Sequence, residues 1–87
     1  MPNADFVGLV QSLLSTAEGA MGEYSPVHHR VQNDGLARER AKKTVESSLR
    51  LLIMLQEKSR GNLDFTESEI LSNAIQVVRG HHQQFEA

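Results

Sequence analysis

The chain has 87 residues, a formal net charge of −2 and 23% charged residues. This is the length of one small domain, without the basic surplus typical of nucleic-acid-binding proteins or the composition of a disordered chain. Cysteine is absent, which excludes disulfides, thiolate metal sites and cysteine nucleophiles. The hydrophobic residues, 39% of the chain, are almost all aliphatic, which favours packed helices over a sandwich or barrel.

The first predicted helix spans about residues 4–21. Asn3 is its expected N-cap, and Asp5 lies in the first turn, where a carboxylate suits the positive end of the helix dipole. Gly22 is expected to end the helix in a left-handed conformation. Apolar residues recur at helical spacing on one face, namely Phe6, Val7, Leu9, Val10, Leu13, Leu14, Ala17, Ala20 and Met21.

Residues 23–34 form the predicted connecting loop, since they contain Pro26 and Asn33 and show no periodicity. The second predicted helix spans about residues 35–60 and is the longest element. Its solvated face is expected to carry the i,i+4 pairs Glu39–Lys43 and Glu46–Arg50. Gly61 is expected to supply the left-handed residue that closes this helix.

The third predicted helix spans about residues 66–80. Thr66 and Glu69 have the spacing of a capping box, in which the first side chain bonds the amide of the second residue and the second side chain bonds back. Phe65 and Ile70 have the spacing of a hydrophobic staple around that cap. Gly80 is the expected end of the helix, and residues 81–87 are predicted to form a tail.

A nearly continuous apolar run, Leu49–Leu55, occupies the second half of the second predicted helix. An amphipathic helix on one small core needs an apolar stripe of three or four positions in seven, so this run indicates cover on more than one side. The alternative is a monomer in which the first and third helices enclose the second. We favour a homodimer or higher homo-oligomer, with an interface formed by Leu49, Leu52, Ile53, Met54 and Leu55. Ile53 and Met54, which lie off the main stripe, are the expected points of contact.

Cations gather near the start of the second predicted helix. Their position at the positive end of a helix dipole is unfavourable, which can indicate contact with an anion or a nucleic acid. The alternative is an ordinary solvated face, and it is supported by the negative net charge and the absence of interleaved aromatic residues. The candidate contact residues are Arg38, Arg40, Lys42 and Lys43.

Two histidine pairs, His28–His29 and His81–His82, are the remaining candidates for chemistry. Adjacent histidines on a helix point in different directions, whereas a helical metal pair needs a spacing of three or four residues. No serine lies in a nucleophile-elbow context and no glycine-rich phosphate loop occurs. We therefore expect no catalytic residue, no metal site and no cofactor.

The pattern from Leu52 to Leu63, with Met54-Leu55, Lys58 and Gly61-Asn62-Leu63, resembles a small bacterial family known as domain of unknown function 1844. Weaker similarity extends over residues 5–80. The resemblance implies a short helical protein of the bacterial cytoplasm and implies no activity.

These observations predict an all-α domain of three helices that assembles into a homo-oligomeric helical bundle. The expected function is that of a non-enzymatic interaction or scaffold module, and the alternative is a nucleic-acid or ribosome-associated accessory protein. The first residues lack the basic region of a signal peptide, and the longest apolar run, Leu51–Leu55, is too short to span a membrane. We therefore expect a soluble cytoplasmic protein.

Overall fold

The computed structural model describes residues 1–23 and 34–86. Within these stretches the chain forms three α-helices and no strand: α1 (Ala4–Glu23), α2 (Asp34–Lys58) and α3 (Phe65–Gln83). The all-α prediction is confirmed for this part of the chain, and α2 is the longest helix, as predicted. Most of the predicted loop, residues 24–33, lies outside the described residues.

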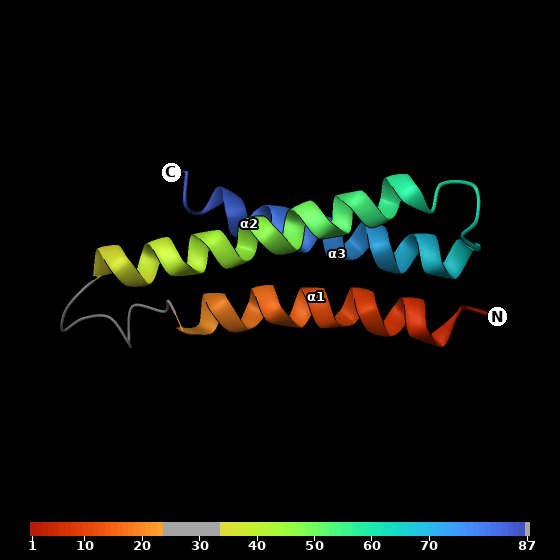
Figure 1. Ribbon diagram of the computed structural model, residues 1–87, viewed down its shortest axis with the longest axis horizontal. Helices are drawn as coiled ribbons and strands as arrows, with labels where there is room; N and C mark the ends of the chain where they lie inside the picture. Colours follow the sequence, from red (N-terminus) through yellow and green to blue (C-terminus); the bar gives the residue numbers. More distant parts are fainter. Residues whose placement is uncertain (24–33, 87) are drawn as a thin grey trace.

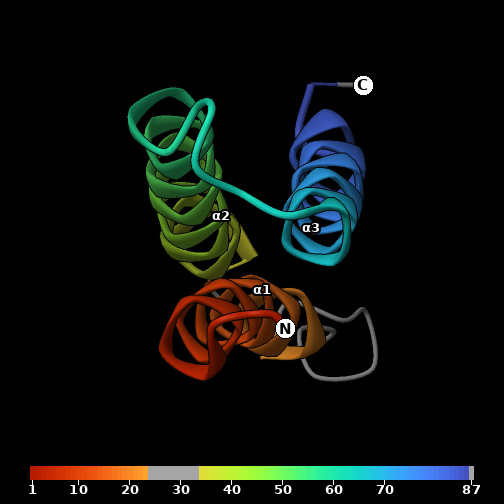
Figure 2. The same cartoon turned by 90° about the vertical axis from the view of Figure 1, so that its right-hand side faces the viewer.

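The three helices form an up-down-up bundle. α1 and α3 run in the same direction and α2 runs in the opposite one (Figure 1). Viewed along the bundle, the helices stand at the corners of a triangle (Figure 2), and each contacts both of the others. α1 and α3 thus touch each other as well as α2, and the core lies along the line where all three meet.

The core consists of short apolar side chains from all three helices. Several of the buried residues are small, namely Ala17 of α1, Ala41 and Ser48 of α2 and Ala74 of α3. The larger side chains fill the space between these positions. The buried hydrophobic residues are Val10, Ala17, Ala41, Val45, Leu52, Leu71, Ala74, Ile75, Val78 and Phe85.

Two of the predicted helix ends are confirmed. The Asn3 side chain accepts a hydrogen bond from the Phe6 amide at 2.9 Å, which makes Asn3 the N-cap of α1. Gly61 has a φ of +84°, the left-handed conformation expected after α2. The predicted stop at Gly22 is wrong, because α1 continues to Glu23. α2 ends at Lys58, two residues earlier than expected.

The capping box of α3 lies two residues before the predicted one. Asp64, not Thr66, is the N-cap: its side chain accepts from the Glu67 amide at 2.7 Å, and the Glu67 side chain accepts from the Asp64 amide at 2.9 Å. The predicted staple is also wrong, since Phe65 is 78% exposed. Both pairs, Asp64–Glu67 and Thr66–Glu69, have the required spacing of three. In the pair that forms, Glu67 is turned inward, is 7% exposed and gains another partner. That partner is the amide of Asn3, 2.6 Å from Glu67 Oε2.

The predicted tail is not a tail. α3 continues through Gly80 to Gln83, and Phe85 beyond it is buried in the core. The Arg38 guanidinium donates a hydrogen bond to the Phe85 carbonyl and lies 5.5 Å from the centroid of the Phe85 ring. A glycine inside a helix costs about 1 kcal/mol relative to alanine, whereas burying a phenylalanine contributes about 1.5 to 3 kcal/mol. The tertiary contact therefore outweighs the local stop signal.

The Glu67 carboxylate is expected to stabilise the fold measurably. Glu67→Ala removes half of the capping box and the bond to Asn3, so the free energy of unfolding should fall by about 1 to 3 kcal/mol. Denaturant unfolding followed by far-UV circular dichroism measures this change. Glu69→Ala, at the exposed position of the capping box predicted from the sequence, is the matched control and should change stability by less than about 0.5 kcal/mol. Equal effects of the two variants would contradict the structure.

Burial of Phe85 gives a second test. Phe85→Ala should lower the free energy of unfolding by about 3 kcal/mol, because it empties a core position. Gln84→Ala, at the exposed neighbouring position, should have little effect. If residues 81–87 were a tail without structural contacts, Phe85→Ala and Gln84→Ala would have the same stability. Thermal unfolding measures this difference.

Candidate functional site

The five residues of the predicted oligomer interface lie at different depths in the structure. Leu52 is fully buried in the core of the chain itself. Leu49, Ile53 and Leu55 are half-buried and pack against that core. Met54 is 40% exposed. Of the five, Met54 alone presents a large part of its side chain to the outside.

The triangular arrangement explains this division. α3 covers one flank of α2 and α1 covers the other (Figure 2), so most of the apolar run is satisfied inside one chain. Burial of Leu49, Leu52 and Ile53 therefore does not by itself require a second subunit. The outer face of α2 retains Met54 and, toward α1, Leu51, which is 38% exposed.

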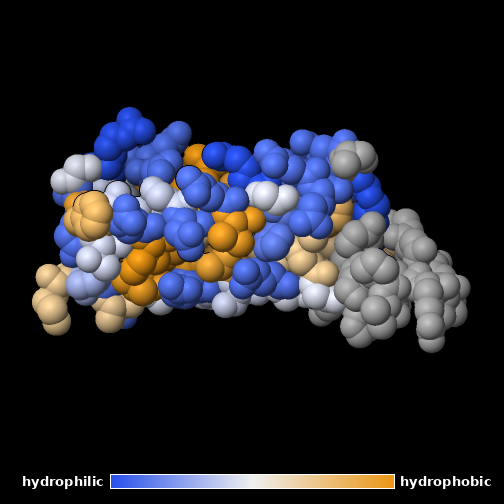
Figure 3. Space-filling model, turned by 180° about the vertical axis from the view of Figure 1, so that it is seen from behind, coloured by the Kyte–Doolittle hydropathy of each residue, from blue (hydrophilic) through white to orange (hydrophobic). Residues whose placement is uncertain are grey.

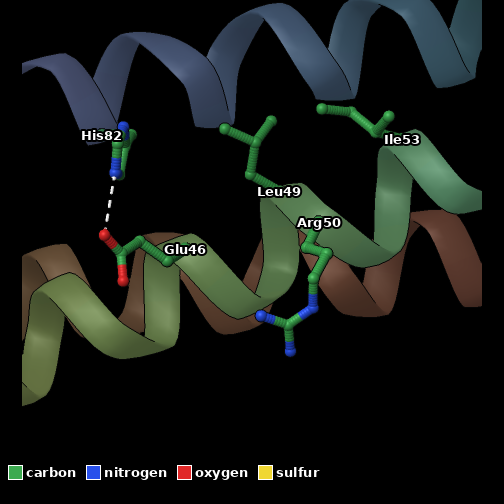
Figure 4. Close-up of a pocket in the computed structure, with 5 residues that line it drawn as sticks. All are labelled: Glu46, Leu49, Arg50, Ile53 and His82. Carbon is green, nitrogen blue, oxygen red and sulfur yellow. Dashed lines mark hydrogen bonds and ion pairs between the residues drawn. The ribbon is translucent and has the colours of Figure 1, made fainter.

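An apolar groove of about 330 Å³ lies between α2 and α3. Leu49 and Ile53 project from α2 toward α3 in this groove, and Glu46, Arg50 and His82 complete its lining (Figure 4). The Arg50 side chain extends away from α3 in Figure 4, toward the outer face of α2. The groove thus combines an apolar wall with charged groups at its edge.

His82 links the end of α3 to α2. Its Nε2 lies 3.2 Å from Glu46 Oε2, and its Nδ1 lies 3.7 Å from Glu86 Oε2. The neighbouring His81 points to α1, where its Nε2 is 4.0 Å from Glu18 Oε2, too far for a hydrogen bond. Because adjacent residues point in different directions on a helix, the two rings reach two different helices.

The contacts of Glu46 and Arg50 differ from the pair that the sequence predicts. Glu46 contacts His82 rather than forming the predicted pair with Arg50, whose guanidinium lies 3.3 Å from the Ser47 hydroxyl. The sequence signal for the Glu46–His82 contact is weak, since the two residues are 36 positions apart. Among the residues that the structure describes, no three histidine or acidic side chains gather in a way that could hold a metal ion. His28 and His29 lie outside the described residues.

A second groove, of about 380 Å³, lies between α1 and α2. Its lining mixes apolar side chains with short hydroxyl side chains and one cation, and it is formed by Leu13, Thr16, Lys43, Thr44, Ser47, Ser48 and Leu51. Leu9, one helical turn before Leu13, is exposed. This groove therefore continues the exposed apolar surface of α2 toward α1.

The four candidate basic residues near the start of α2 do not form one patch. Arg38 is half-buried against Phe85. Arg40 and Lys43 are exposed and Lys42 is half-buried. Residues three or four positions apart share a helix face, so Arg38 and Lys42 lie on one side of α2 and Arg40 and Lys43 on another.

The face of the bundle opposite to that of Figure 1 exposes hydrophobic side chains. Hydrophobic patches lie along the middle of this face and are bordered by hydrophilic side chains (Figure 3). None of the three helices, as far as they are described, has the length and apolar content needed to cross a bilayer. The outer face of α2 and its two grooves combine exposed apolar side chains with charges.

Comparison with known proteins identifies one relationship. No curated protein and no solved structure matches the chain. The model of a protein family described as Domain of unknown function (DUF1844) matches residues 3–83. The match covers most of the chain and includes the Leu52–Leu63 pattern. The chain belongs to this family of unknown function.

Proposed function

We propose that this chain is a non-enzymatic helical protein of the bacterial cytoplasm that self-associates through the outer face of α2 and serves as an interaction or scaffold module. The observation that carries the proposal is the exposure of Met54, at 40%, and of Leu51, at 38%, in a segment whose other apolar side chains are at least partly buried. The cellular location is supported by the resemblance to a bacterial family and by the absence of cysteine.

The size of the bundle supports self-association. A domain of this length buries only about 60% of the surface that its unfolded chain exposes, so its stability is marginal and further burial is valuable. Covering Met54, Leu51 and the wall of the α2–α3 groove would remove additional apolar surface from water, at about 25 cal/mol per Å². Contiguous exposed apolar surface rimmed by polar residues is typical of protein interaction sites.

The shape of the grooves supports a binding role over catalysis. A catalytic site usually encloses its substrate and brings several polar groups together in one pocket. The α2–α3 groove has an apolar wall and a close polar contact across it, between Glu46 and His82. Such a surface suits another protein side chain better than a reacting substrate.

The nucleic-acid alternative has less support. Arg38 is occupied by Phe85. Of the other three cations, Arg40 and Lys43 share one side of α2 and Lys42 lies on another. A phosphate backbone would need several of them on one surface.

Self-association is tested by Met54→Glu. At roughly 100 μM the wild-type chain should form a dimer or larger oligomer in light scattering, and Met54→Glu should weaken assembly by about tenfold or more, because a charge replaces an apolar contact. The variant should keep its helical content, since Met54 is already partly exposed. Gln76→Glu, on the exposed face of α3, is the matched control and should assemble like the wild type. A wild-type chain that stays monomeric would overturn the proposal.

A further inference from the structure

The side of α2 that faces α1 carries lysines. Toward α1, the exposed Leu51 is accompanied by Lys43, which lines the same groove. Lys58, seven residues after Leu51, lies on the same side of the helix. Lys43 also borders the outer face of α2, where the acidic residues Glu46 and Glu57 lie about three turns apart. Two copies that met over the α1–α2 groove would bring lysines from both α2 helices together.

The outer face of α2 has a self-complementary pattern. Arg50 and Glu57 are both exposed and lie seven residues apart on one side of α2, with Ile53 and Met54 between them. Along a second α2 that runs in the opposite direction, Glu57 comes first, then the same apolar residues, and then Arg50. A second α2 lying antiparallel on the first would therefore place Glu57 opposite Arg50 twice, with the apolar residues in the middle.

We infer that the partner of this face is a second copy of the chain, packed antiparallel on the outer face of α2, with a two-fold axis between Ile53 and Met54. This inference rests on the proposed self-association and specifies its geometry. Arg50 of each copy pairs with Glu57 of the other, and Met54 of each copy faces Ile53 of the other. The flexible methionine side chain can enter the apolar α2–α3 groove, whose wall includes Ile53.

The proposed dimer uses the same surface of both copies. In a two-fold interface each contact occurs twice, so a surface must complement itself. A parallel pairing of the same faces would bring Arg50 against Arg50 and Glu57 against Glu57, which is repulsive. The ion pairs therefore select the antiparallel orientation, and the apolar centre supplies most of the affinity.

Charge reversal tests this geometry directly. Arg50→Glu and Glu57→Arg should each weaken the homodimer by about tenfold or more, because each brings like charges together twice. The double variant Arg50→Glu/Glu57→Arg should restore the wild-type affinity. An equimolar mixture of the two single variants should form heterodimers in preference to either homodimer, as measured by sedimentation or native mass spectrometry. Circular dichroism should show unchanged helical content for all of these surface variants.

Disulfide trapping gives a second readout, since the chain has no cysteine of its own. A mixture of Arg50→Cys and Glu57→Cys should form a mixed disulfide dimer. Arg50→Cys alone should not, because the two copies of position 50 would be offset by about 10 Å along the axis, beyond the reach of a disulfide. Crosslinking of Arg50→Cys with itself would indicate a parallel pair and overturn the inference.

The outcomes separate the two proposals. A dimer that is weakened by Leu51→Glu but indifferent to the charge reversals would overturn the antiparallel geometry and leave self-association intact. A wild-type chain that is monomeric at the same concentration would overturn both. Restoration by the double variant, together with the mixed disulfide, would support both.

Discussion

The Glu67 carboxylate holds together the end of the bundle on which the rest of the structure depends. One of its oxygens accepts from the Asn3 amide and the other from the Asp64 amide. Asn3 and Asp64 are the N-caps of α1 and α3, so a single side chain fixes the starts of both helices at the same level. Because these helices run in the same direction, their positive dipole ends lie together, and a carboxylate between them offsets that repulsion.

The opposite end of the bundle is fixed by contacts of a different kind. Arg38 near the start of α2 binds the Phe85 carbonyl, and His82 contacts Glu46. Here the side chains of α2 and the last turns of α3 satisfy one another. Since α2 is held near its start by Arg38 and in its middle by Glu46, and is covered on two flanks, its rotation about its own axis is determined. That rotation turns Met54 outward and Leu52 inward.

Local signals predicted the helices well, and long-range contacts account for the errors. Asn3 and Gly61 follow from the conformational preferences of single residues, and the sequence places both correctly. The capping box was misassigned because Thr66–Glu69 and Asp64–Glu67 fit the same spacing rule. The deciding contact comes from Asn3, 64 residues from Glu67. Likewise, Phe85 is held by Arg38, 47 residues away, which no local pattern of the last seven residues could indicate.

For a related reason, the periodicity of the apolar run in α2 does not identify what covers it. Helical periodicity shows that Leu49–Leu55 needs cover on two sides, but it does not show whether a neighbouring helix or a second chain provides it. In the structure α3 covers Leu49 and Ile53 in part and leaves a groove beside them. The contacts of Glu67 and of Arg38 lie at the ends of the bundle, whereas this partly covered surface lies near the middle of its longest helix. A second copy would therefore add burial to apolar side chains that one chain covers only in part.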